Sequence, residues 1–210
     1  MRGTGARVAA IATGALVVCA LAAVVAWRPW GARASHADNL PREIQSVMNE
    51  ADSTGEARAA ATARAVKMIR RLGRNETPKN ARLLRRLKDL PNEQIRREAV
   101  LALGRHPGTD PVLLSGVLEE DPSPGTRAAA ARSLSRLRNR KAIPKLVEAL
   151  GDKDQQVRIW AISALNSTCW VRFTYRADDP VAKRRHDIRI IKRLLTTWGL
   201  LEDAPARTGR

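Results

Sequence analysis

The residues that most often carry catalysis or bind metals are isolated in this chain. His36 lies in a polar segment, His106 precedes a proline, and His186 lies in a basic helical pattern. Cys19 falls in an apolar run and Cys169 stands beside a tryptophan, so neither has a companion at metal-ligand spacing. No histidine pair has i, i+4 spacing, no CxxC occurs, and no glycine-rich phosphate loop follows a strand pattern. We therefore predict a protein that is not an enzyme, with no catalytic residue, no cofactor and no bound metal.

Positive charge is the stronger chemical signal. The chain has 38 Lys and Arg against 21 Asp and Glu, which gives a net charge of +17. A balance this basic favours acidic partners, although an arginine-rich solvated surface explains it equally well. A helical pattern over residues 181–198 places apolar residues on one side and cations on another. We take four of these cations as the candidate binding surface: Arg185, Arg189, Lys192 and Arg193.

A second basic group precedes the first along the chain and leaves a polyanion-binding alternative open. Its members are Arg70, Arg71, Arg74, Arg82, Arg85, Arg86 and Lys88. Proteins that hold single-stranded nucleic acid combine such cations with aromatic side chains on which bases stack. Aromatic residues make up only 3% of this chain. Binding to a protein partner is therefore the preferred prediction, and nucleic acid or another polyanion is the alternative.

An internal repeat predicts the elements that position these residues. The set Ile95, Arg96, Ala99 and Leu103 recurs as Thr126, Arg127, Ala130 and Leu134, and again as Val157, Arg158, Ala161 and Leu165, each time 31 residues later. Periodicity of this length is typical of a stacked helical solenoid, in which each unit packs on the next. Leu72-Gly73-Arg74 precedes Leu103-Gly104-Arg105 by the same interval, which adds an earlier unit over 57–90.

Each unit is predicted to contain two helices. In residues 92–120 the first helix runs from about Asn92 to Arg105, and a second begins at Pro111. The inward positions expected in the second helix are Val112, Leu114, Val117 and Leu118. The last unit starts with a helix over 155–166, and after an irregular stretch its partner helix spans 181–198. We expect this final segment, with Trp170, Phe173 and Tyr175, to cap the array.

The N-terminal part predicts a membrane segment. The run from Val8 to Trp27 has no charged residue, and about 20 residues at about 1.5 Å each span roughly the 30 Å of a bilayer core. We interpret it as an uncleaved signal-anchor, with the bulk of the chain extracytoplasmic. A cleaved signal peptide ending near Ala32-Arg33-Ala34 is an alternative. A lipoprotein signal fits less well, because Val18 precedes Cys19 where a small residue is needed.

The segments "NEQIRREAVLALGR" and "DKDQQVRIWAISAL", joined through "AIPKLVEALGDKD", resemble HEAT repeats of the short bacterial type also found in phycobilisome lyase subunits. The resemblance implies a scaffold and does not carry lyase activity. In that family an arginine near the start of the first helix pairs with an acidic residue in a neighbouring turn. Here the matching structural repeat arginines are Arg96, Arg127 and Arg158, and the candidate acidic partners are Asp121, Asp152 and Asp154.

These observations predict an all-α protein: an α-solenoid of about four HEAT-like helix pairs with an N-terminal transmembrane helix. The predicted parts are an anchor over 1–30, a linker over 31–56, repeats over 57–167, a cap over 168–199 and a tail over 200–210. The predicted function is a membrane-anchored, single-pass scaffold for protein–protein interaction. The alternative is a basic α-solenoid that binds nucleic acid or another polyanion.

Overall fold

The computed structural model describes residues 41–42, 44–45, 55–75 and 77–202, and these are helical with no strand. The prediction of an all-α fold is therefore confirmed. The helices are α3 (Gly55–Leu72), α4 (Pro78–Leu87), α5 (Glu93–Leu103), α6 (Pro111–Glu120), α7 (Pro124–Leu137), the short 3-10 helix η3 (Arg140–Ala142), α8 (Ile143–Ala149), α9 (Gln155–Cys169) and α10 (Val181–Thr197). The predicted membrane segment, Val8 to Trp27, lies outside the described residues. Among those that are described, none forms a helix with the length and apolar character needed to span a bilayer.

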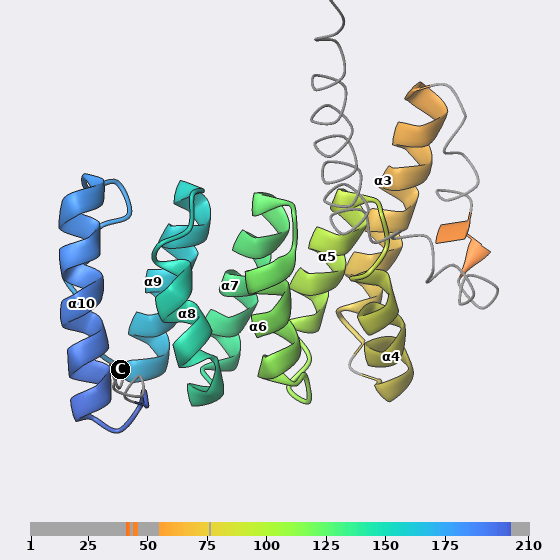
Figure 1. Cartoon of the computed structure of the whole chain (residues 1–210). Coiled ribbons are helices and arrows are strands. Elements are labelled where there is room, and N and C mark those ends of the chain that lie inside the picture. Colours follow the sequence, from red (N-terminus) through yellow and green to blue (C-terminus); the bar gives the residue numbers. More distant parts are fainter. Residues whose placement is uncertain (1–40, 43, 46–54, 76, 203–210) are drawn as a thin grey trace, which may run out of the picture. The chain divides into compact units, whose positions relative to one another are not determined.

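The helices form consecutive pairs, α3/α4, α5/α6, α7/α8 and α9/α10, which follow one another along the array (Figure 1). The first helices of successive pairs, α3, α5, α7 and α9, pack side by side in one layer. In the second layer α6 contacts α8, and α8 contacts α10. This is the arrangement of an α-solenoid, in which every pair buries its apolar faces against its neighbours.

The starts of the first-layer helices are fixed by the same local device in three repeats. Asn92, Ser123 and Asp154 stand 31 residues apart, and each is the N-cap of its helix. Each side chain accepts a hydrogen bond from the backbone N–H three residues later, which satisfies one donor that the helix start leaves unpaired. The predicted starts of α5 and α6 are confirmed, whereas α9 continues to Cys169, past the predicted end at Asn166.

The recurring apolar positions form the core. Ile95, Ala99, Leu103, Ala130 and Leu165 are buried, as the repeat predicts. The expectation for Val112 is wrong, because its side chain is 57% exposed. Residues on an α-helix are separated by about 100°, so Val112 lies about 160° away from the inward-facing Leu114. Its position in the first turn of α6 therefore faces solvent.

Two glycines let the first-layer helices approach closely. A Cβ built on Gly73 would lie 2.7 Å from the Cβ of Ala102, and one built on Gly104 would lie 2.3 Å from the Cβ of Ser133. Gly104 caps α5 in ordinary helical geometry, so space and not backbone conformation requires glycine there. The same contact thus recurs between α3 and α5 and between α5 and α7.

The irregular stretch between α9 and α10 packs on the last repeat. Phe173 and Tyr175 are buried, and the Tyr175 hydroxyl donates a 2.6 Å hydrogen bond to the carbonyl of Leu150. The Phe173 ring stacks on Trp198 with 6.2 Å between centroids. Trp170 does not join this cluster: it caps α9 in the left-handed conformation, with φ of 57°, and its residue is 80% exposed. Of the three aromatic residues expected in the cap, only Phe173 and Tyr175 are therefore buried.

Candidate functional site

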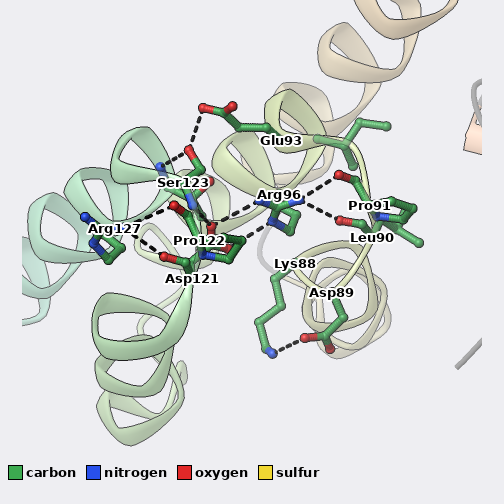
Figure 2. A network of polar contacts seen from close by, with 12 residues as sticks. Lys88, Asp89, Leu90, Pro91, Glu93, Arg96, Asp121, Pro122, Ser123 and Arg127 are labelled. Atoms are coloured by element: carbon green, nitrogen blue, oxygen red, sulfur yellow. Dashed lines mark hydrogen bonds and ion pairs between the residues drawn. The ribbon is translucent and has the colours of Figure 1, made fainter. Parts of the chain in front are cut away.

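The first repeat arginine, Arg96, lies at the junction of three segments (Figure 2). Its Nε and Nη2 donate to the two carboxylate oxygens of Asp121 at 2.9 and 3.1 Å. Its Nη1 donates to the carbonyls of Leu90 and Pro91 at 3.1 and 2.7 Å. The side chains of Arg96 and Asp121 are only 5% and 7% exposed. One guanidinium thus joins the turn before its own helix to the turn that follows α6.

The second repeat arginine makes the same set of contacts one unit later. Arg127 donates from Nε and Nη2 to both carboxylate oxygens of Asp152, each at 2.9 Å, and from Nη1 to the carbonyls of Asp121 and Pro122. Burial raises the pKa of Asp152, but hydrogen bonds from Arg127 and from the Asp154 backbone N–H outweigh it, so this pKa lies below its ordinary value. The hydrogen bond to Asp152 raises the pKa of Arg127.

The third repeat arginine has a different partner. Arg158 donates from Nη1 to the carbonyls of Asp152 and Lys153, which repeats the contacts of the earlier units. Its Nε and Nη2 both donate to the carbonyl of Ala177, at 3.0 and 2.8 Å, where the earlier arginines contact a carboxylate. The third candidate acid, Asp154, is the N-cap of α9 and contacts none of these guanidinium groups among the described hydrogen bonds.

The candidate binding surface on α10 is exposed along its whole length. Arg185, Arg189, Lys192 and Arg193 all face solvent, while Ile191 and Leu195 on the opposite side are buried. The structure brings only the last two of the four cations to a common cleft with another part of the fold. Arg185 and Arg189 lie on the same helix outside this cleft.

That cleft is open, has a volume of about 1090 Å³ and separates η3 and α8 from the C-terminal end of α10. We call it the α8–α10 cleft. Four cations line it, namely Arg140, Lys141, Lys192 and Arg193. None of the four takes part in the ion pairs found within the described part of the chain. Sequence reasoning missed Arg140 and Lys141, because they lie in the short helix η3 between α7 and α8 and belong to no periodic pattern.

The cleft also has apolar and acidic lining. Leu200 and Leu201 supply apolar surface, and Glu148 and Glu202 supply carboxylates. Glu148 already pairs with Lys145 at 3.0 Å. The cleft therefore presents cations, two carboxylates and apolar side chains within one open concavity.

The residues considered for catalysis or metal binding remain apart. His106 is buried in the turn after α5, whereas His186 is exposed on α10. Cys169 is half-buried, and burial raises the pKa of its thiol above the ordinary value. Within the described residues, no three His, Cys, Asp or Glu side chains are grouped so that they could hold a metal ion.

Comparison with known families gives a match over the C-terminal half of the array. Residues 111–186 match the model of a family described as HEAT repeats. The match covers α6 to the first turns of α10, including Arg127 and Arg158, and it supports a HEAT-repeat protein. A comparison with curated proteins found no match.

Proposed function

We propose that this HEAT-repeat chain is a non-enzymatic scaffold that binds a protein partner through the α8–α10 cleft. The observation that carries the proposal is the gathering of Arg140, Lys141, Lys192 and Arg193 around one open cleft with no intramolecular ion pair in the described part of the chain. HEAT repeats commonly mediate protein–protein interaction, which agrees with this role. The subtype expected from the sequence, the short bacterial type, is part of the same proposal.

The polar contacts of the repeat arginines support a pre-organised binding surface. Each guanidinium bridges two turns, so successive helix pairs are held in a fixed register. We infer that Arg96, Arg127 and Arg158 serve the fold and contact no partner, because Arg96 and Arg158 are buried and all three donate inward. A surface that is rigid before binding loses less conformational entropy on association.

The lining of the cleft favours a protein over a polyanion. Glu148 and Glu202 would repel a dense row of phosphates, whereas a protein surface can offer basic, acidic and apolar groups to match. No aromatic side chain lines the cleft, so bases would have no ring on which to stack. A polyanion remains the alternative, and the experiment below separates the two.

The test is affinity capture with the full-length protein and a charge-reversed cleft variant, Lys192→Glu with Arg193→Glu. The matched control is Arg82→Glu with Arg85→Glu, which makes the same charge change on two exposed positions of α4. We expect a protein that withstands nuclease treatment to be captured by the parent and the control and lost from the cleft variant. Capture that nuclease abolishes would favour the polyanion, and equal capture by all three proteins would overturn the cleft.

Membrane attachment through Val8 to Trp27, with the bulk of the chain extracytoplasmic, is a proposal from the sequence alone. It rests on a length suited to a bilayer and on the lack of charge. Fractionation followed by N-terminal sequencing tests it. We expect the intact chain in the membrane fraction, and a soluble chain that begins near Ser35 would contradict it.

A further inference from the structure

A second set of arginines recurs with the period of the array and lies on the surface. Arg74, Arg105 and Arg136 stand 31 residues apart, at or just after the C-terminal ends of α3, α5 and α7, and all three are exposed. We call them the arginine row. Because α3, α5 and α7 pack side by side, the row crosses three neighbouring helices of the first layer.

The members of the row lie close to one another. Arg74 and Arg105 line one open cleft of about 460 Å³, together with Arg70 and Gly73. Arg136 continues the row from Arg105. Its pKa is lowered by burial and then by the positive charges of Arg132 and Arg105. Like charges held at this proximity are destabilising, and an anion placed between them would relieve that repulsion.

Acidic side chains that could neutralise the row are scarce in this layer. The helices α7 and α9 contain no Asp or Glu. The Glu98 carboxylate of α5 is buried and accepts two hydrogen bonds from Arg70, at 3.1 and 2.9 Å. Its pKa is lowered chiefly by this bond to Arg70, and the positive charge of Arg105 adds only a smaller effect. The repeat arginines, by contrast, each have a carboxylate or a carbonyl within hydrogen-bond distance. In the described part of the chain, no ion pair involves Arg74, Arg105 or Arg136.

We propose that the arginine row binds an extended acidic segment of a protein partner, with carboxylates of the segment placed on successive arginines. Packed helices lie about 8–10 Å apart, and an extended chain advances about 3.3 Å per residue. A carboxylate at about every third residue of the segment would therefore meet one arginine per repeat. The guanidinium fork matches a carboxylate with two parallel hydrogen bonds. This inference rests on the proposed function as a protein-binding scaffold and adds a second surface to it.

A protein segment fits this layer better than a nucleic acid does. Single-stranded nucleic acids are held by aromatic side chains on which the bases stack. Two rings belong to α9 and its C-cap, and each has a guanidinium over one face. Arg132 lies over Trp160 at 4.9 Å from the ring centroid, and Arg138 lies over Trp170 at 5.0 Å. Trp160 is itself only half-exposed. The row therefore supplies charge and no ring of its own, and the rings of α9 and its C-cap already have an arginine over one face.

The test uses the full-length protein and two fluorescent probes. The first is a peptide of about twelve residues with glutamate at every third position, and the second is an oligo-dT of about twelve nucleotides. The row variant combines Arg74→Gln, Arg105→Gln and Arg136→Gln. The matched control combines Lys79→Gln, Arg82→Gln and Arg85→Gln on α4, which removes the same charge from an exposed surface outside both the row and the α8–α10 cleft. Thermal unfolding of each variant establishes that it remains folded.

We expect the row variant to weaken binding of the acidic peptide by about tenfold or more, and the α4 control to weaken it by less than about twofold. An equal loss of peptide affinity in both variants would show that net charge alone attracts the peptide, and would overturn the proposal that the row is its binding site. If the parent binds oligo-dT more tightly than the acidic peptide, and the row variant loses that binding, the ligand of the row is a nucleic acid and the proposal of an acidic segment is wrong. If the α8–α10 cleft variant loses the captured protein but still binds the acidic peptide as the parent does, the cleft and the row are two separate binding surfaces and both proposals are supported. Failure of the capture experiment together with row-dependent peptide binding would refute the cleft and retain the row.

Discussion

The contact between Gly104 and Ser133 gives a sharp prediction about the packing of the array. A Cβ at position 104 would lie 2.3 Å from Ser133 Cβ, 2.4 Å from its Oγ and 2.8 Å from its Cα. The last of these is a backbone atom, so no change of rotamer removes the overlap. Gly104→Ala therefore forces α5 and α7 apart. We expect it to destabilise the protein by about 1–3 kcal/mol, the usual cost of overpacking a filled contact.

Gly116→Ala is the matched control for the same chemical change. Gly116 lies inside α6, and a Cβ built there meets nothing within 4 Å. Alanine in a helix interior is favoured over glycine by about 0.5–1 kcal/mol, so this variant should be more stable than the parent. For a domain of this size, 1 kcal/mol corresponds to about 2–4 °C in Tm. Circular dichroism melts of the full-length variants in detergent should thus move in opposite directions, and shifts of the same sign would refute the close-approach reasoning.

A second substitution tests whether Ser133 is the residue with which a Cβ at position 104 overlaps. Ser133→Gly alone removes the hydrogen bond from the Ser133 hydroxyl to the carbonyl of Val100, which is 3.0 Å long, and should destabilise. Combined with Gly104→Ala, however, it removes the Cβ and Oγ that obstruct the new methyl group. We expect the double variant to be more stable than the sum of the single effects by about 1 kcal/mol. Additive effects would indicate that the methyl group is accommodated elsewhere.

Two further predictions concern the polar and apolar cores. The lowered pKa of Asp152 means that its pair with Arg127 contributes stability above the ordinary carboxyl pKa of about 3.9, and that this contribution is lost as pH falls through the lower folded-state value. Asp152→Asn should therefore reduce the free energy of unfolding at neutral pH by about 1–3 kcal/mol, and this free energy should then decline less steeply as the pH falls. Urea unfolding from pH 7 to about pH 3 measures both effects. A decline with pH that is the same as in the parent would contradict the prediction. Ala130→Arg should unfold the array, because a large charge replaces a fully buried methyl group at a cost of about 3 kcal/mol or more. The exposed substitution Arg136→Ala should change stability by less than about 0.5 kcal/mol, and equal Tm values for the two variants would show that the register is wrong.

The helix pairs could be predicted because core and capping positions obey the same period. Leu103, Leu134 and Leu165 are all buried, so one inward position fixes the face of three helices. Burial of a side chain depends on its angle about the helix axis, and that angle is encoded in sequence spacing. Val112 was wrongly predicted to face inward because its apolar character was considered without its angle about the helix axis. The spacing of Val112 from Leu114 already contains the information that it faces solvent.

The acceptor of Arg158 and the α8–α10 cleft could not be predicted, because both depend on the irregular parts of the chain. By the repeat period, the partner of Arg158 should be at position 183, which is a lysine. The sequence therefore indicates that the carboxylate is missing, but no periodic rule points to the carbonyl of Ala177, which replaces it. The α8–α10 cleft also depends on this irregular stretch. Arg140 and Lys141 line one cleft with Lys192 and Arg193 because the stretch between α9 and α10 returns the chain to α8.

Two arginine series with an identical period show where sequence reasoning about function must stop. Arg96 and Arg127 donate to carboxylates and carbonyls inside the array, whereas Arg74 and Arg105 line an open surface cleft with no carboxylate paired to either in the described part of the chain. Residue type and spacing are the same, so periodicity alone assigns both series one role. What separates them is the acceptor that the fold places within about 3 Å of each guanidinium. A satisfied guanidinium stabilises the turn that it bridges, and an unsatisfied one on a surface remains available to a partner's anion. The repeat therefore determines where arginines recur, and the turns between the helices determine which of them have an acceptor within the fold.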